Sequence, residues 1–246
     1  MRILISIDDT DDAVSRGTGE IAEILADGLV SLELASVGRV TRHQLLIHPD
    51  IAYTSHNSSM CFEADIAEEA LPDVIGWCAE RLAAESVAAA DPGLAIVVPE
   101  RVVDLDRLMA FGHEAKERVL TKEQAYSLAE ELGVHLSEHG GTGIGVIGAL
   151  AGAGLKLTGN DGRFKGKFRL VGDDCGVADV AGIKTQGVDD VRTLEGETLS
   201  DAERVVVGDQ CKLILRDGIA VLMVRPSDDG ASAPWMIVDR KALRAF

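Results

Sequence analysis

Acidic side chains gather where the first apolar segment of the chain ends. Residues 3–7 form a short apolar run that leads directly into Asp8, Asp9, Asp11 and Asp12. Carboxylates this close together repel one another unless they gain a cation, bind protons or lie fully in water. Their hard oxygen atoms suit Mg²⁺, which proteins usually hold with one or two carboxylates and the phosphates of a substrate. The cluster therefore indicates a metal site, and a solvated acidic turn is the alternative.

A glycine turn follows the acidic cluster. Gly17, Thr18 and Gly19 open an amphipathic helix whose apolar face carries Ile21 and Leu25. Glycine lets the backbone come close to a ligand, and the N–H groups at a helix N-terminus bind anions. Because the acidic cluster and this turn are so close in sequence, together they predict a site for a metal–nucleotide complex.

A second glycine-rich stretch, residues 140–154, allows three interpretations. Gly143, Gly145 and Gly148 have the spacing of a dinucleotide-binding fingerprint, but residues 135–139 make a poor preceding strand and a basic loop follows. Close packing of a helix through small residues is the second interpretation. The third is a further cradle for a phosphate or ribose, built from the N–H groups of Gly143 and Gly145. We favour the cradle because the metal site needs a ligand.

The apolar periodicity predicts an α/β or α+β fold with a mixed sheet. Strands are expected at residues 3–7, 60–64 and 94–98, with a longer strand or hairpin arm at 34–47. Helices are expected at residues 21–32, 72–87, 104–119 and 122–132. From about residue 168 short strands and turns take over. We expect a nucleotide- and metal-binding domain over residues 1–160 and a smaller strand-rich unit over residues 161–246, separate or packed into the same domain.

The composition limits the partners. The formal net charge is −17 and aromatic residues make up 4% of the chain, whereas nucleic-acid binding relies on clustered Lys and Arg and on stacking. Direct tRNA binding is therefore not expected. No segment resembles a signal peptide or membrane span, and the four cysteines lie far apart, as in a cytosolic protein with reduced thiols. We expect a cytoplasmic protein, and a homodimer is compatible with the sequence.

Three motifs resemble, in the same order, the kinase-like N-terminal domain of the archaeal tRNA 2-agmatinylcytidine synthetases, which modify an isoleucine tRNA. They are the acidic strand end at residues 7–11 with its glycine turn, the loop at residues 49–57, and the helix start at residues 145–151. The loop is similar to the family's Pro-x-Ile-Pro-x-Lys-Thr-x-Gly-Asn motif. The resemblance spans about residues 3–155, so we expect a shorter, stand-alone relative without the family's OB-fold and zinc-ribbon tRNA-binding domains.

The resemblance implies ATP and Mg²⁺ as cofactors. It implies that Asp8, Asp9 and Asp11 are metal ligands, with Asp9 central to catalysis. It makes Thr18 the candidate phospho-acceptor, in a turn that reads Gly-Thr-Gly here where the family has Cys-Thr. It also places Asn57 beside the phosphates.

A basic loop adds two further candidates. Arg163 and Lys165 lie in a concentrated mixed-charge segment of an otherwise acidic chain. The guanidinium group suits forked contacts with phosphate oxygens. We expect Arg163 or Lys165 to contact the nucleotide or a second substrate, and a solvated loop is the alternative.

These features together predict an ATP-dependent, kinase- or ligase-like enzyme. It would transfer a phosphoryl or adenylyl group to an unidentified small-molecule or protein acceptor. The rival enzyme class is the haloacid-dehalogenase-type phosphatase, in which Asp9 would attack phosphorus and Asp173, Asp174 and Asp179 would form the late acidic motif. A non-catalytic nucleotide-sensing module is the third possibility.

Overall fold

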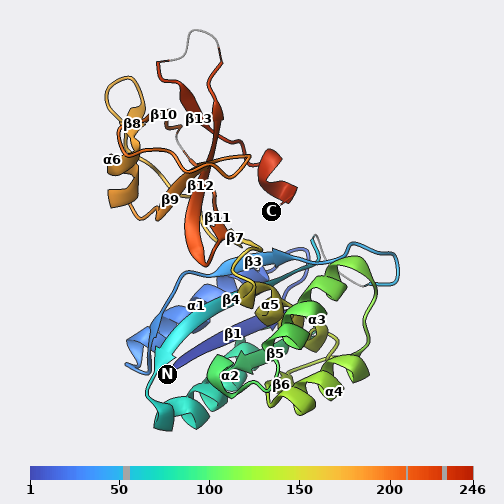
Figure 1. The fold of residues 1–246 in the computed structure, drawn as a ribbon. Coiled ribbons are helices and arrows are strands. Elements are labelled where there is room, and N and C mark those ends of the chain that lie inside the picture. The colour runs from blue at the N-terminus through green and yellow to red at the C-terminus, as the bar shows by residue number, and fades with distance from the viewer. Residues whose placement is uncertain (52–55, 209, 229–231, 246) are drawn as a thin grey trace. The chain divides into compact units, whose positions relative to one another are not determined.

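The computed structural model describes residues 1–51, 56–208, 210–228 and 232–245. The chain divides into two compact units, Met1–Thr158 and Gly159–Phe246, which we call unit 1 and unit 2. Figure 1 shows the helices of unit 1 around its strands and the strand-rich composition of unit 2.

Unit 1 is built on an antiparallel sheet with the strand order β6-β5-β1-β4-β3, and β2 pairs with β4. Its described strands are β1 (Arg2–Asp8), β2 (Ala35–Val37), β3 (Thr41–Gln44), β4 (Ser58–Ile66), β5 (Gly93–Val97) and β6 (His135–Glu138). Its described helices are α1 (Thr18–Ser31), α2 (Leu71–Glu85), α3 (Leu105–Glu117), α4 (Lys122–Leu132) and α5 (Val146–Leu157), with short 3-10 turns η1 (Glu68–Ala70) and η2 (Pro99–Arg101). The central strand β1 therefore has a hydrogen-bonded neighbour on each side.

Alternation along β1 gives this sheet a helical layer on both faces (Figure 1). Ile3, Ile5 and Ile7 pack in a buried core with residues of α1 and α2. Leu4 belongs to a second core that includes α3, α4 and α5. Because successive side chains of a strand point to opposite faces, Asp8 lies on the same face as Leu4, toward α5.

Helix α5 approaches the sheet closely because glycine occupies its inward face. A Cβ atom added at Gly148 would overlap the Asp8 carboxylate, and one added at Gly152 would overlap the Ser59 hydroxyl. Gly145 likewise meets backbone atoms too closely for any side chain. These positions recur every three to four residues, which is the spacing of one helix face. Packing through small residues therefore accounts for these three glycines.

Unit 2 has a mixed sheet in the order β7-β11-β12-β13-β10-β8, and β9 pairs with β12. Its described strands are β7 (Arg163–Phe164), β8 (Val177–Asp179), β9 (Asp190–Thr193), β10 (Arg204–Val206), β11 (Leu213–Arg216), β12 (Ile219–Pro226) and β13 (Trp235–Ile237). The short helix α6 (Val180–Thr185) and the 3-10 turn η3 (Ala242–Ala245) complete it. Pairs β9–β12 and β10–β13 are parallel.

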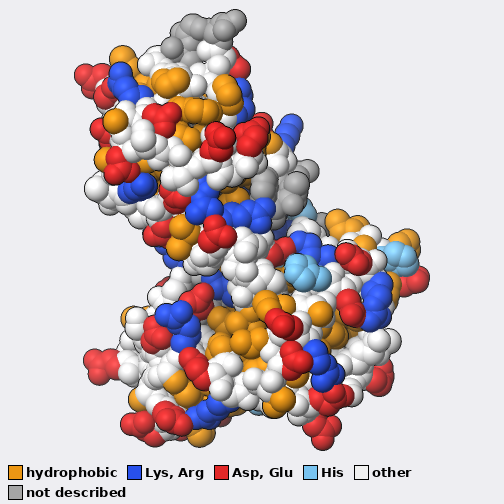
Figure 2. Space-filling view, viewed as in Figure 1, with side chains coloured by type: hydrophobic (Ala, Val, Ile, Leu, Met, Phe, Trp, Pro, Cys, Tyr) orange, Lys and Arg blue, Asp and Glu red, His pale blue; other side chains and the backbone are white. Residues whose placement is uncertain are grey.

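The predicted fold class, mixed α/β with a strand-rich C-terminal region, is confirmed. Two details differ. Residues 135–138 do form a strand, because β5 offers them hydrogen-bonding partners at Gly93–Ile96. The strand or hairpin arm predicted at residues 34–47 consists of two short strands, β2 and β3, which both pair with β4. None of the described helices is long and apolar enough to cross a membrane. Figure 2 shows Asp and Glu side chains scattered, with Lys and Arg among them, over the visible surface of both units.

Candidate metal–nucleotide site

Helix α1 begins beside the acidic cluster. Its N-cap residue, Gly17, has extended backbone and no side chain caps the helix. Thr18 is buried, and its Oγ1 donates a hydrogen bond to Asp11 Oδ1 at 3.4 Å. The first N–H groups of a helix have no partner within it, so this helix start offers donors for an anion next to a carboxylate. The structure thus brings the predicted residues Asp11, Gly17, Thr18 and Gly19 together.

Asp8 is held in a poorly solvated position at the end of β1. Only 9% of the residue is exposed, and its Oδ1 accepts the backbone N–H of Asp9 at 2.9 Å. Burial raises the pKa of Asp8 to about 7, and the charges of Asp9 and Asp11 act in the same direction. A cation within reach would favour the ionised carboxylate and reverse this shift.

Asp9 lies at a turn in the backbone immediately after the strand. Its φ of 52° is in the left-handed region. Burial, followed by the charges of Asp91 and Asp11, raises the pKa of Asp9 to about 6. Asp91 is a site residue that the sequence did not reveal, because it reads as part of an ordinary Asp-Pro-Gly turn. It is brought here by the pairing of β5 with β1, in which Gly93 lies opposite Asp8.

The carboxylates of Asp8, Asp9 and Asp11 suit a divalent cation that also binds phosphate. Carboxylates with raised pKa values repel one another, and a hard cation would relieve that repulsion. Within the described part of the chain, no group of three or more His, Cys, Asp and Glu side chains is arranged to hold a metal ion. Mg²⁺ commonly needs only one or two carboxylates and completes its shell with water and phosphate oxygens. One or two of these carboxylates would therefore be enough for a metal ion whose other ligands come from water and phosphate.

Backbone N–H groups in the loop that leads into α5 donate hydrogen bonds to oxygen atoms of the protein. The N–H of Gly143 donates to the carbonyl of Gly140 at 3.1 Å, and the N–H of Gly145 donates to the carbonyl of Asp91 at 3.0 Å. The N–H of Thr142 donates to the Asp91 carboxylate. These bonds fix the helix start beside the acidic cluster. The nucleotide contacts of Gly143 and Gly145 stay a prediction. A nucleotide would have to compete with these hydrogen bonds for the same N–H groups.

Two buried hydroxyl groups belong to residues near the carboxylates. One is adjacent in the sequence, and the other lies on the neighbouring strand of the sheet. Thr10 follows Asp9 directly, and Ser59 lies on β4, where its hydroxyl borders the Gly152 position of α5. Thr10 Oγ1 and Ser59 Oγ are buried and have no hydrogen-bond partner among the described residues. Buried polar groups without a partner cost free energy, and a ligand or water molecule would satisfy them. In the sequence, Thr10 lies between Asp9 and Asp11 and so reads as part of the acidic cluster, whereas Ser59 follows Ser58 at the start of an apolar run and gives no signal of its own.

The remaining predicted contacts lie in other elements. Asn57 Nδ2 donates to the carbonyl of Leu46 at 2.7 Å, which closes the connection between β3 and β4. Residues 52–55, part of the loop that resembles the family motif, lie outside the described residues. Arg163 is the first residue of β7 in unit 2, and Lys165 follows that strand. The nucleotide contacts of Asn57, Arg163 and Lys165 stay predictions.

Comparison with known proteins supports the resemblance in fold. No protein-family model matches the chain, and no curated protein matches it. A solved structure described as a tRNA fluorescent labeling enzyme matches with a TM-score of 0.55 and 25% identity, over 63% of this chain and 36% of that chain. The complex of TiaS with an isoleucine tRNA and ATP matches with the same values. The complex of TiaS with an isoleucine tRNA, AMPCPP and agmatine matches with a TM-score of 0.53 and 25% identity, over 62% of this chain and 36% of that chain.

TiaS is the agmatidine synthetase of an isoleucine tRNA, the enzyme family that the sequence motifs resemble. The predicted resemblance is therefore confirmed by the structural match. The matched share of this chain is close to the share taken by unit 1. The chain spans little more than a third of the length of the structures it matches. It is similar to one part of TiaS.

Proposed function

We propose that the protein binds Mg²⁺–ATP at the acidic end of β1 and transfers a phosphoryl or adenylyl group to an unidentified acceptor. The observation that carries the proposal is the arrangement of Asp8, Asp9 and Asp11 next to the N-terminus of α1. The similarity to structures of TiaS with ATP and with AMPCPP supports a nucleotide as the ligand of this fold. The raised pKa values of Asp8 and Asp9 support a cation among the carboxylates.

Each residue has a role in this proposal. One or two of Asp8, Asp9 and Asp11 would hold Mg²⁺, which when bound neutralises charge on phosphate oxygens. The N–H groups at Gly17–Gly19 would contact the phosphates, as helix N-termini do for anions. Asp11 accepts the hydrogen bond of the Thr18 hydroxyl, which is how a general base is placed to take a proton. Phosphorylation of Thr18 is therefore a testable part of the proposal.

The rival phosphatase function has less support from the late acidic motif. The Asp173 carboxylate accepts the N–H of Val177 at 2.9 Å and pairs with Arg204 at 2.8 Å. Asp179 caps helix α6 by accepting the N–H of Gly182 at 2.7 Å. These acidic side chains serve local structure within unit 2, which is their ordinary use in turns and caps.

Thermal unfolding with ATP, GTP, NAD and a phosphosugar, each with and without Mg²⁺, tests the binding. Mg²⁺–ATP should stabilise the protein by about 2.7 kcal/mol at a hundredfold excess over Kd. The absence of a shift with every nucleotide at millimolar concentration would overturn the proposal. Isothermal titration calorimetry of the responding ligand then gives its affinity and metal dependence.

Two assays separate transfer from hydrolysis. Incubation with ATP followed by intact-mass measurement at neutral pH should show any stable phosphate on Thr18, and Thr18→Ala should abolish it. Hydrolysis of p-nitrophenyl phosphate should be negligible. Rapid hydrolysis that Asp9→Asn abolishes would replace the proposal with the phosphatase function, since an aspartyl phosphate would then be the intermediate.

A further inference from the structure

A cavity lies within unit 2, where two parallel strands separate. Strands β10 and β13 remain paired as far as Val206 and Met236. Beyond that point the N–H of Val207 donates to the carbonyl of Gly176, whereas Val238 continues beside β12. The space between the diverging chains is part of a cavity of about 400 Å³, a size typical of small-molecule sites. Crevices beyond the carboxyl ends of parallel strands are frequent ligand sites.

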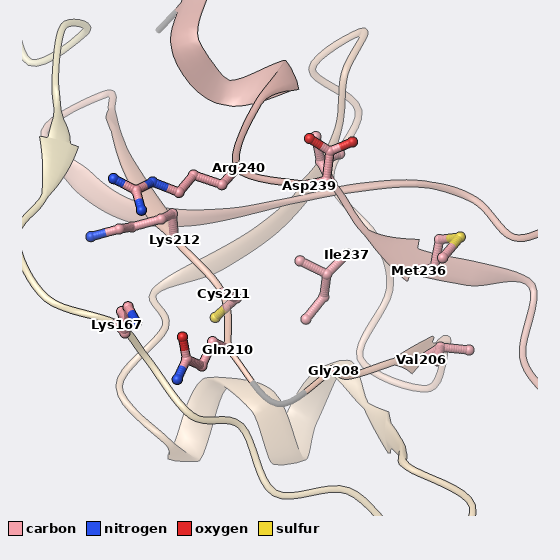
Figure 3. Close-up of a pocket in the computed structure, with 11 residues that line it drawn as sticks. Lys167, Val206, Gly208, Gln210, Cys211, Lys212, Met236, Ile237, Asp239 and Arg240 are labelled. Atoms are coloured by element: carbon pink, nitrogen blue, oxygen red, sulfur yellow. The ribbon is translucent and has the colours of Figure 1, made fainter.

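The lining of this cavity is polarised (Figure 3). Its cationic end is formed by Lys167, Lys212 and Arg240. Its apolar end is formed by Val206 and Met236, and Ile237 lies between the two ends. An organic ligand that carries an anionic group at one end and an apolar body at the other matches this division.

Asp239 is the acidic residue among the described lining residues. The Asp239 carboxylate accepts the backbone N–H groups of Lys241 at 2.7 Å and Ala242 at 3.0 Å, and in Figure 3 it points away from the lysines. Lys212 Nζ donates to the carbonyl of Gly166. Lys167, Lys212 and Arg240 thus bring three basic side chains to the described lining of this cavity, in a chain whose net charge is −17.

We propose that this cavity binds a small organic phosphate with an aromatic or apolar body, the class that includes nucleoside monophosphates. The phosphate would lie against Lys167, Lys212 and Arg240. Arg240 can make two parallel hydrogen bonds to phosphate oxygens, and the lysines supply point charges. The body would contact Met236 and Ile237. This site is built from unit 2 alone and is independent of the metal–nucleotide site.

Nuclear magnetic resonance of the ¹⁵N-labelled full chain with AMP tests the proposal. The titration is done in EDTA, which removes the Mg²⁺ on which the other site depends. Amide signals at Val206, Cys211 and Ile237 should shift, and adenosine should bind at least about tenfold more weakly than AMP. A tenfold loss corresponds to about 1.4 kcal/mol of binding free energy.

Matched substitutions complete the test. Arg240→Gln should weaken AMP binding about tenfold, and Lys167→Gln, at another exposed lining residue, should weaken it as well. Lys241→Gln makes the same charge change one residue further, outside the lining, and should change the affinity less than twofold. The proposal is overturned if no cavity amide shifts at millimolar AMP, if adenosine binds as well as AMP, or if Lys241→Gln has the effect of Arg240→Gln. Tighter binding of a short single-stranded RNA, with shifts that avoid the cavity, would also overturn it.

Discussion

The starts of helices α1 and α5 have the same glycine-rich character in the sequence but serve different purposes in the structure. At α5, the inward face of the helix has no room for a Cβ atom at Gly145 or Gly148, and the loop N–H groups bond to protein oxygens. At α1, a Cβ atom added to Gly17 would make only an ordinary contact, 3.5 Å from Asp11 Oδ2. Glycine at α5 lets a helix approach a sheet, whereas glycine at α1 leaves a helix start open beside carboxylates.

This difference shows why a glycine pattern alone does not identify a phosphate site. Absence of a side chain permits close approach of any group, whether ligand or backbone. The glycines of α1 and α5 differ in the group that lies opposite them. Gly148 faces a strand of its own protein, through Asp8, and that contact also fixes where the Asp8 carboxylate lies. The two glycine segments are therefore complementary, since one fixes the position of Asp8 and the other lies next to Asp11.

The largest expected effect is on folding at α5. Gly148→Ala should lower the free energy of unfolding by about 3 kcal/mol, because the added methyl group overlaps the Asp8 carboxylate and close-packed interiors resist extra volume. Gly76→Ala on α2 is the matched control, since no atom lies within 4 Å of its added Cβ. That control should gain up to about 1 kcal/mol from helix propensity. Urea unfolding measures both, and equal stability of the two variants would contradict the packing described for α5.

The next effect concerns the ligand. Asp9→Asn should remove most of the stabilisation of about 2.7 kcal/mol expected from a hundredfold excess of Mg²⁺–ATP, and should leave the ligand-free protein equally or more stable, because it relieves repulsion with Asp91 and Asp11. Asp27→Asn removes one charge from the exposed surface of α1 and should retain the full ligand effect. Thermal unfolding with and without ligand compares them. A variant that only unfolds would indicate a structural role for Asp9.

The pH dependence of the ligand-free protein should report the burial of Asp8. Its pKa is about 7 in the folded protein and near 3.8 when exposed. The folded state therefore binds more protons at Asp8 between these values, so the contribution of Asp8 to stability is greatest below about pH 4 and is lost as the pH rises to about 7. The loss attributable to Asp8 is limited by the difference between these two pKa values, at about 1.4 kcal/mol per pKa unit.

Asp8→Asn sharpens this measurement. The variant should be more stable than the parent at pH 8, where the parent carries a buried charge, and should match it at pH 4, where Asp8 is protonated. Urea unfolding at both pH values without Mg²⁺ gives the comparison. If the variant is equally destabilised at both, the carboxyl group has a packing role that does not depend on its charge.

The smallest effect is expected at α1. Gly17→Ala should change the free energy of unfolding by less than about 1 kcal/mol, because a Cβ atom fits there. The same variant should weaken Mg²⁺–ATP binding severalfold if phosphates approach this helix start. Calorimetric titration, paired with urea unfolding, tests both statements. A large loss of stability without a change in affinity would make Gly17 a packing residue like Gly148.

Local patterns were enough to predict the main elements of unit 1. Residues 3–7 form most of β1, and the helix predicted at 122–132 has both capping-box hydrogen bonds between Thr121 and Gln124. These features depend on residues close in sequence, where periodicity and capping chemistry act directly. The acidic cluster at the end of β1 could be predicted for the same reason, since its residues are neighbours in the sequence.

The rest of the site depends on pairing between distant segments. Asp91 reaches Asp9 only through the register of β5 against β1, and register cannot be read from a turn motif. The ion pair of the buried Lys156 with Glu63, at 3.2 Å between α5 and β4, also requires the packed structure. In unit 2, short strands such as β7 and β9 become strands through their partners, since each has too few residues for a periodic pattern.

The backbone conformation at Asp9 makes aspartate a costly residue at this position. A left-handed residue other than glycine costs about 1 kcal/mol or more, and this one also carries a carboxylate that its neighbours repel. Glycine would remove both costs, so the fold by itself gives no reason for an aspartate at this position. Folded proteins have small stability margins. The proposed binding of a cation would account for an aspartate at a position where the fold alone does not favour one.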